Sequence, residues 1–268
     1  MRKYCLALLI FCLCACQRED SRMHSNLATF TNCAHRGASG HAPENTLAAM
    51  RVAMEMDAHM SELDIQQTAD DRLVVLHDDS LERTTSGKGF LWQKPLAELQ
   101  TYEAGKWFAP QFAGEPLPTL EEVIALVRGK MKLNIEVKLH GHERDIAKLV
   151  VATIRREKFE AECIVTSFGH NVADEIKALA PELKVGYIFG KEEYHESVFE
   201  GPVEVLSVNH YLISPEFMNK ARAAHKEVHV WTVNDKPLMH RMMDLGVDAI
   251  ITNYPDRLAE VIRERKGK

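Results

Sequence analysis

One stretch near the amino end sets the β/α character of the chain. It reads Phe30-Thr31-Asn32-Cys33-Ala34-His35-Arg36-Gly37-Ala38-Ser39-Gly40-His41-Ala42-Pro43-Glu44-Asn45-Thr46. The apolar run at 30–34 predicts a strand, and the small residues after it predict a loop that a ligand can approach closely. Pro43 suits the start of a helix, which we expect over 44–57 with Glu44 in its first turn. His35 and Arg36 therefore stand where a strand ends, and an imidazole beside a fixed cation suits an anionic substrate such as a phosphate.

Outward from this stretch, short β-type runs alternate with helix-type patterns along the chain. The predicted strands are 30–34, 60–66, 131–138, 163–167, 184–189, 203–208, 228–233 and 249–252. The predicted helices are 44–57, 120–127, 143–158, 172–180, 191–198, 215–224, 237–245 and 256–265. Eight of each in a chain of 268 residues predict an α/β fold, a (β/α)8 TIM barrel of parallel strands over 30–268.

One region interrupts the alternation. An extra β-type run at 73–76 is followed by a long stretch, 79–118, that is rich in aromatic residues and proline. We predict that 79–118 is an insertion after the second strand. In a barrel such loops belong at the carboxyl ends of the strands, over the active site.

The first 29 residues differ in character from the predicted barrel. Arg2 and Lys3 precede an apolar run too short to span a bilayer, which predicts a signal peptide over 1–15. The run ends Leu13-Cys14-Ala15-Cys16, which resembles the lipobox of bacterial lipoproteins. This resemblance implies lipidation of Cys16, a polar tether over 16–29, and an exported protein anchored to a membrane of the cell envelope, at its periplasmic face or at the outer membrane. An ordinary secretory signal peptide is the alternative.

Composition narrows the partners further. The formal net charge is −6 and there is no basic tract, which argues against a nucleic-acid partner. Four of the six cysteines lie in the leader, so a disulfide framework is not indicated. We expect Cys33 and Cys163 to be small buried thiols, although a bridge between them stays open in an exported protein.

Carboxylates lie within two neighbouring predicted strands. Glu62 and Asp64 point to one face because side chains alternate along a strand, and Glu136 shares a face with Lys138 on the next strand. Buried carboxylates on one face are costly unless a cation offsets them. Oxygen ligands suit a hard cation, so we predict a divalent metal held by Glu62, Asp64 and Glu136, with Ca²⁺ favoured over Mg²⁺. The alternative is that each carboxylate pairs with a nearby lysine or arginine.

A second histidine is predicted beside these carboxylates. If the strand at 60–66 turns back through Asp70-Asp71, the numbers of paired residues sum to 141, and Asp64 lies opposite His77. A slip of one residue would turn His77 away. We predict that His35 and His77 divide proton transfer around a metal-bound phosphate, in an order that stays open, while cations contact its oxygens.

Several motifs in order carry a family resemblance. They are His35-Arg36-Gly37, Pro43-Glu44-Asn45-Thr46, Glu62-Leu63-Asp64, His77-Asp78, Leu81-Glu82-Arg83-Thr84-Thr85-Ser86-Gly87, Ile135-Glu136-Val137-Lys138 and Trp231-Thr232-Val233-Asn234. The set resembles the glycerophosphodiester phosphodiesterase family, in a bacterial lipoprotein form. The resemblance implies a TIM barrel with an insertion after the second strand and these roles: acid/base pair, His35 and His77; metal ligands, Glu62, Asp64 and Glu136; phosphate contacts, Arg36 and Lys138; substrate pocket, Trp231; metal shell, Glu44.

The implied reaction is metal-dependent hydrolysis of glycerophosphodiesters such as glycerophosphocholine or glycerophosphoethanolamine. The products are sn-glycerol 3-phosphate and an alcohol, with the substrate's 2-hydroxyl as an internal nucleophile. Two alternatives stay open. One is a phosphodiesterase that acts on lysophospholipid or sphingolipid head groups, with aromatic residues of the insertion around an acyl chain. The other is a non-enzymatic surface-binding lipoprotein.

Overall fold

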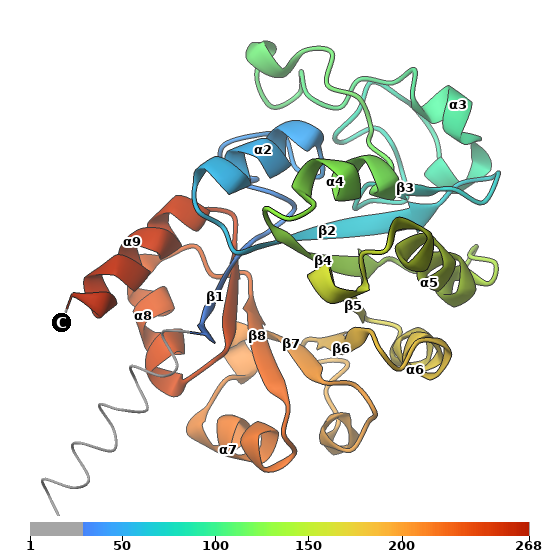
Figure 1. The fold of residues 1–268 in the computed structure, drawn as a ribbon. Helices are drawn as coiled ribbons and strands as arrows, with labels where there is room; N and C mark the ends of the chain where they lie inside the picture. Colours follow the sequence, from blue (N-terminus) through green and yellow to red (C-terminus); the bar gives the residue numbers. More distant parts are fainter. Residues whose placement is uncertain (1–28, 268) are drawn as a thin grey trace, which may run out of the picture.

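Within residues 29–267, which the computed structural model describes, eight parallel strands close into a barrel (Figure 1). They are β1 (Thr31–Ala34), β2 (Met60–Gln67), β4 (Lys132–Val137), β5 (Cys163–Ser167), β6 (Lys184–Phe189), β7 (Val205–Asn209), β8 (Glu227–Trp231) and β9 (Ala249–Thr252). Their hydrogen-bonded order is β1-β9-β8-β7-β6-β5-β4-β2, and β1 also pairs with β2, which closes the ring. The predicted (β/α)8 TIM barrel is therefore confirmed.

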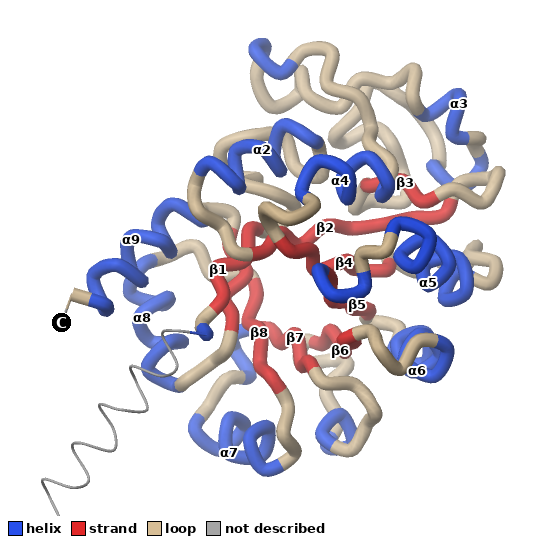
Figure 2. The backbone as a smooth tube through the Cα atoms, viewed as in Figure 1, coloured by secondary structure: helices blue, strands red, loops and turns tan. Residues whose placement is uncertain are grey.

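Helices surround the ring of strands (Figure 2). They are α2 (Leu47–Glu55), α4 (Leu120–Val127), α5 (Ile146–Glu157), α6 (His170–Leu179), α7 (Pro215–Ala223), α8 (Lys236–Leu245) and α9 (Pro255–Lys266). Helix α4 shows how the sequence specifies them. Thr119 and Glu122 form a reciprocal capping box at its start, and its apolar residues at helical spacing are buried.

Two of the differences from the predicted helices concern the loop before α2 and the segment after β6. Helix α2 begins at Leu47 because the side chain of Thr46 caps it by accepting a hydrogen bond from the backbone N–H of Ala49. Glu44 therefore lies in the preceding turn. The predicted helix at 191–198 is wrong, and only the short 3-10 helix Glu196–Phe199 is present there. Val198 is the one buried residue of 191–198, so a longer helix would have no apolar face to pack.

The predicted hairpin register is also wrong by one residue. Strand β3 (Leu73–Val75) pairs antiparallel with β2, with Ile65 opposite Val75, so paired numbers sum to 140. The backbone N–H of Thr68 donates to the carbonyl of Arg72, and the loop therefore holds the three residues 69–71 instead of two. Asp71 has a left-handed backbone (φ 58°), as three-residue hairpin loops require near their end. Leu76, not His77, faces Asp64 across the hairpin.

The segment predicted as an insertion, 79–118, lies beyond β3 at one side of the barrel (Figure 1). It contains α3 (Leu96–Leu99) and the 3-10 helices Leu91–Gln93 and Pro110–Phe112. A small apolar cluster, separate from the barrel core, joins it to β3; its members are Val74, Leu76, Leu81, Leu91, Leu99, Ala104 and Leu117. Packing of its own therefore holds this segment in a defined shape.

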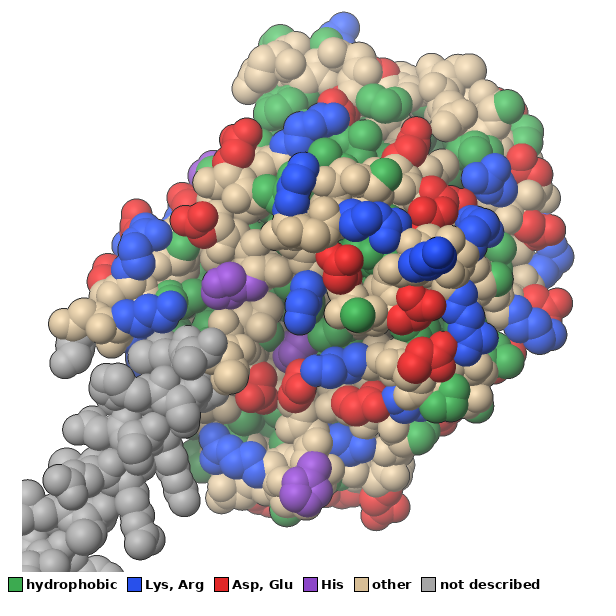
Figure 3. Space-filling view, viewed as in Figure 1, with side chains coloured by type: hydrophobic (Ala, Val, Ile, Leu, Met, Phe, Trp, Pro, Cys, Tyr) green, Lys and Arg blue, Asp and Glu red, His purple; other side chains and the backbone are tan. Residues whose placement is uncertain are grey.

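Several predictions for the amino end lie outside the described residues. They are the signal peptide at 1–15, Cys16, and the tether at 16–29 except for Thr29. None of the helices in 29–267 is long and apolar enough to cross a membrane. Cys33 and Cys163 are free and buried, as expected of small thiols in strands. On the face seen in Figure 3, basic and acidic side chains are interspersed and form no large patch of one sign.

Candidate active site

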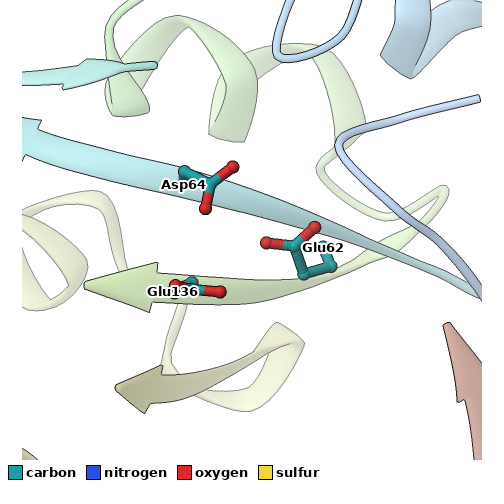
Figure 4. Close-up of side chains that lie close together, drawn as sticks. All are labelled: Glu62, Asp64 and Glu136. Carbon is teal, nitrogen blue, oxygen red and sulfur yellow. The ribbon is translucent and has the colours of Figure 1, made fainter. Parts of the chain in front are cut away.

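Three carboxylates meet inside the barrel, toward the carboxyl ends of two strands (Figure 4). Glu62 and Asp64 come from β2, and Glu136 comes from β4, where it is paired in register with Asp64. One oxygen of each lies within 4.8 Å of the others. Strand alternation and the neighbouring positions of β2 and β4 thus bring together the three residues that the sequence indicated as ligands.

Two cations face this cluster, so one carboxylate stays without a charged partner of its own. Arg36 Nε lies 3.3 Å from Asp64 Oδ2, and Lys138 Nζ lies 2.8 Å from Glu136 Oε1. Glu62 Oε2 accepts a hydrogen bond from the backbone N–H of Arg36, at 2.9 Å. Glu62 Oε1 is buried and has no hydrogen-bond partner. The alternative in which a lysine or arginine neutralises every carboxylate does not hold for Glu62.

Burial shifts the protonation of the cluster. It raises the pKa of Glu62 well above its ordinary value, and the neighbouring charges of Asp64 and Glu136 add to the shift. Burial and Asp64 likewise raise the pKa of Glu136, to about 7. Crowded carboxylates of this kind are stabilised in their charged form by a nearby positive ion. The unpartnered oxygen and the all-oxygen donor set together fit a hard divalent cation.

His35 follows the last residue of β1 and faces the carboxylates. Its Nδ1 lies 2.7 Å from Asn253 Oδ1, an amide oxygen that can only accept. Nδ1 therefore carries the hydrogen of the ring. Nε2 faces the carboxylate cluster and lies 3.9 Å from Glu62 Oε2. Burial and the charge of Arg36 lower the pKa of His35 to about 4, so the ring is neutral near pH 7.

His77 reaches the same pocket although the hairpin register differs from the predicted one. Strand β3 ends at Val75, so strand alternation no longer decides where His77 points. Its Nδ1 lies 2.7 Å from Asp78 Oδ1, and its Nε2 lies 3.3 Å from Lys138 Nζ. Burial lowers the pKa of His77, and Asp64 partly opposes that shift.

A cavity of about 150 Å³ joins the two histidines to an aromatic wall. Its lining includes His35, His77, Lys138, Phe168 and Trp231. The rings of Phe168 and Trp231 meet edge to face at 5.8 Å, and Lys138 Nζ lies 5.7 Å from the centre of the Phe168 ring. One side of the cavity is therefore charged, and the other is apolar.

A larger cavity, of about 820 Å³, lies at the opposite end of the barrel. Charged side chains in its lining pair with each other, as Lys184 and Glu227 do at 2.7 Å. The carboxylate cluster and the two predicted catalytic histidines are all at the carboxyl ends of the strands, where barrel enzymes carry out their chemistry. We therefore assign the site to the smaller cavity.

Glu44 lies behind Arg36 instead of within the carboxylate cluster. Its Oε1 accepts hydrogen bonds from Arg36 and from Arg83, both at 2.8 Å. Glu44 is not one of the three residues whose oxygens come together. In this structure it holds the arginine that faces Asp64.

Sequence reasoning assigned no role to four residues that hold the site together. Asn45 bonds Asp64 twice, through its Nδ2 to Asp64 Oδ2 at 2.8 Å and through its Oδ1 to the backbone N–H of Asp64 at 3.2 Å. Asp78 forms a hydrogen bond with His77 and accepts one from Arg83. Asn253 forms a hydrogen bond with His35. Asn45, Asp78 and Arg83 lie inside the sequence motifs that carry the family resemblance, and this position was the signal that could have identified them. Asn253 is more than two hundred residues from His35, and only the closed barrel brings them together.

Comparison with known proteins adds independent information. The model of the glycerophosphoryl diester phosphodiesterase family matches residues 35–257. A glycerophosphodiester phosphodiesterase of Caldanaerobacter subterraneus subsp. tengcongensis is 38% identical over 242 residues, which cover 86% of this chain and 97% of that protein. A glycerophosphodiester phosphodiesterase of Bacillus subtilis is 30% identical over 249 residues, 85% of either chain.

Solved structures agree with these matches. A phosphodiesterase of Oleispira antarctica, in complex with the product sn-glycerol-3-phosphate, superposes with a TM-score of 0.78 at 30% identity, over 86% of this chain and 96% of that one. A glycerophosphodiester phosphodiesterase of Agrobacterium tumefaciens gives a TM-score of 0.75 at 29% identity, over 85% and 98% of the two chains.

Proposed function

The chain belongs to the glycerophosphoryl diester phosphodiesterase family and is an enzyme of that class, and we propose that it hydrolyses small glycerophosphodiesters such as glycerophosphocholine or glycerophosphoethanolamine. The products would be sn-glycerol 3-phosphate and the alcohol. The observation that carries this proposal is the convergence of two histidines, two cations and the carboxylates of Glu62 and Glu136 on one cavity, with Asp64 beside these two carboxylates. The non-enzymatic alternative gives no reason for such a costly set of buried charges.

Arg36 and Lys138 supply the fixed positive charge for the phosphate. Burial opposes the charge of Lys138, but Glu136 and Asp64 raise its pKa, so the ammonium persists near neutral pH. The backbone N–H of Arg36 donates a hydrogen bond to Glu62, and its guanidinium donates one to Glu44. These two contacts fix the position of Arg36 at the cavity. Both cations can contact non-bridging phosphate oxygens through charge-assisted hydrogen bonds.

We propose that Glu62, Asp64 and Glu136 hold a divalent metal, with Ca²⁺ preferred to Mg²⁺. The support is the buried oxygen of Glu62 that lacks a partner and the three carboxylates offered at one point. Mg²⁺ usually binds proteins through one or two carboxylates and keeps several waters, whereas Ca²⁺ accepts more protein oxygens. When bound, the ion would orient the phosphate and offset negative charge that grows in the transition state.

The partners of the two histidines support an order of proton transfer. His35 is held by a neutral amide and is uncharged near pH 7, which suits a base that removes the proton of the substrate's 2-hydroxyl. Burial lowers the pKa of His77, but the hydrogen bond to the carboxylate of Asp78 opposes this shift and stabilises the protonated ring, which suits an acid that gives its proton to the departing alcohol oxygen. The hydroxyl oxygen bonds to phosphorus as the bond to the alcohol breaks. Water then opens the cyclic phosphate with the two roles exchanged.

The size of the cavity favours a deacylated substrate. Pockets that enclose drug-sized ligands usually measure about 300–1,000 Å³. The cavity here, of about 150 Å³, suits a glycerol phosphate group and leaves no enclosed volume for an acyl chain. We therefore prefer small diesters to lysophospholipids or sphingolipids as substrates.

We also propose that the chain is exported and anchored through Cys16 at the cell envelope, at its periplasmic face or at the outer membrane. The support is the sequence Leu13-Cys14-Ala15-Cys16 after an apolar leader. If this is correct, Cys16→Ser moves the protein from the membrane fraction to the soluble fraction. An unchanged membrane fraction would remove the lipid anchor from the proposal.

The proton roles can be tested with two leaving groups. His35→Ala should remove turnover of both glycerophosphocholine and the p-nitrophenyl diester of glycerol 3-phosphate. His77→Ala should remove turnover of the first and largely keep release of p-nitrophenolate from the second, because p-nitrophenolate leaves without a proton. The cyclic phosphate should then accumulate, because its opening by water also needs His77. His240→Ala, on α8 and outside the cavity, is the control. Full activity of both active-site variants on glycerophosphocholine would contradict the mechanism.

A further inference from the structure

We propose that Asp78 and Arg83 are positioning residues that set which ring nitrogen of His77 faces the substrate. The two residues lie at the start of the segment that follows β3, outside the carboxylate cluster. Through these two residues the segment would take part in catalysis, although none of the residues 79–118 lines the cavity. The inference rests on the proposed function, because it concerns how His77 transfers a proton.

The contact between Asp78 and His77 determines the tautomer. Asp78 Oδ1 lies 2.7 Å from His77 Nδ1. An ionised carboxylate only accepts hydrogen bonds, so Nδ1 must carry the hydrogen. Nε2 is then the nitrogen left on the cavity side, where it lies 3.3 Å from Lys138 Nζ. A ring in the other tautomer would put two acceptors against each other at Nδ1.

Arg83 keeps Asp78 in place and ionised. Its guanidinium contacts Asp78 through Nε at 2.5 Å and through Nη2 at 3.1 Å. The same group reaches Glu44 through Nη1 at 3.1 Å and Nη2 at 2.8 Å. Hydrogen bonds from Arg83 and from His77 hold the pKa of Asp78 well below its usual range. The planar guanidinium of arginine can donate hydrogen bonds to two carboxylates at once, whereas the ammonium of lysine lacks this geometry.

The network connects two loops of the barrel. Glu44 belongs to the loop between β1 and α2, and it also binds Arg36, the proposed phosphate contact, at 2.8 Å. Asp78 and Arg83 belong to the segment after β3. Arg83 therefore ties the loop that carries one proposed catalytic group to the loop that carries the proposed phosphate contact. Its loss should misplace His77 more than it disturbs the barrel core, because Arg83 is not part of that core.

Kinetic changes should follow this arrangement. Asp78→Asn keeps the size of the side chain but can offer an N–H to Nδ1 and so favour the wrong tautomer. We expect kcat on glycerophosphocholine to fall by about 10²–10⁴-fold, the usual contribution of a general acid, with KM little changed. Arg83→Lys should give a smaller fall than Arg83→Ala. The double variant Asp78→Asn/Arg83→Ala should be no worse than the more severe single variant, because the two residues act through one histidine.

The decisive experiment reads the tautomer directly. The whole protein labelled with ¹⁵N-histidine is examined by NMR through the long-range couplings of the ring nitrogens, alongside the kinetics of the same variants. The wild-type spectrum should show His77 with hydrogen on Nδ1, and Asp78→Asn should shift this pattern. Asp71→Asn is the matched control, since Asp71 also pairs with an arginine, Arg144, at 2.7 Å, away from the cavity.

Two outcomes separate this inference from the proposed function. An unchanged His77 tautomer and unchanged kcat in Asp78→Asn would overturn the positioning role. If wild-type protein releases no glycerol 3-phosphate, the proposed function fails, whereas the NMR result still decides whether Asp78 sets the tautomer. If Asp78→Asn fails to fold, Arg83→Lys provides the same two readouts: a loss of kcat with an altered His77 spectrum supports the inference, and a wild-type result for both contradicts it.

Discussion

Two non-glycine residues adopt a left-handed backbone conformation in the loop between β1 and α2. They are Arg36 (φ 55°) and Asn45 (φ 60°). Each has a direct contact with the carboxylate cluster, Arg36 through its backbone N–H to Glu62 and Asn45 through its side chain to Asp64. This backbone conformation, which is unfavourable for arginine and better tolerated by asparagine, is therefore coupled to the position of two proposed ligands, as is common at functional sites.

Asn45→Ala should weaken metal binding. It removes both hydrogen bonds to Asp64 and leaves an alanine in left-handed backbone, so we expect metal affinity to fall by about 10–100-fold and stability by about 1–3 kcal/mol. Isothermal titration with Ca²⁺ and chemical denaturation measure the two effects. Asn45→Gly is the control for backbone strain, and it should share the loss of affinity. Unchanged Ca²⁺ affinity in both variants would contradict the role of Asn45.

Trp231→Ala tests the aromatic side of the cavity. The indole meets Phe168 edge to face and lies on the proposed substrate side, so its loss should remove binding contact that substrate and transition state share. Steady-state kinetics on glycerophosphocholine should show KM raised more than kcat is lowered. The reverse order, a large fall in kcat at constant KM, would place Trp231 among the groups that act only in the transition state.

Secondary-structure elements show where sequence patterns are informative and where they are not. Strand alternation and barrel order predicted the convergence of Glu62, Asp64 and Glu136, because both depend only on local periodicity. The hairpin register depended on the length of one loop, and a third loop residue moved it by one position. His77 nevertheless reached the cavity because β3 ends before it. The contact of His35 with Asn253 follows from the pairing of β1 with β9, which no local pattern contains.

The small apolar cluster between β3 and the segment 79–118 gives a prediction at this scale. Leu91 is fully buried there, and Leu91→Ala should cost about 2–5 kcal/mol of local stability by leaving a cavity. Hydrogen exchange measured by mass spectrometry should rise in peptides of 79–118 and stay unchanged in β5 to β8. A uniform rise across the barrel would show that this segment and the barrel unfold as one unit.

At the scale of the molecule, closing the barrel concentrates negative charge at one end of its interior. Three carboxylates lie there beside two cations. Without metal, the folded protein therefore keeps protons on these carboxylates at pH values where the unfolded chain would release them. The folded pKa of Glu136, about 7, is above its ordinary value of 4.5. Its contribution to stability is therefore complete below the unfolded pKa and is lost as pH rises through about 7.

This linkage predicts a pH-dependent effect of metal. Because a divalent cation binds the ionised carboxylates, the increase in Tm on adding Ca²⁺ should be small at about pH 5.5 and larger at about pH 8. Differential scanning calorimetry with and without Ca²⁺ at both pH values measures it. Glu62→Gln should reduce the increase, since it removes the carboxylate that lacks a cation of its own. An equal increase at both pH values would contradict the linkage.

We propose a metal-assisted phosphodiesterase that acts on small glycerophosphodiesters. Its most direct test is release of sn-glycerol 3-phosphate from glycerophosphocholine by the purified protein, measured before chelation, after exhaustive chelation, and after return of Ca²⁺ or Mg²⁺. We predict turnover that is lost on chelation and restored by Ca²⁺ more fully than by Mg²⁺. Undiminished turnover after complete removal of metal, or no release of glycerol 3-phosphate under any condition, would contradict the claim.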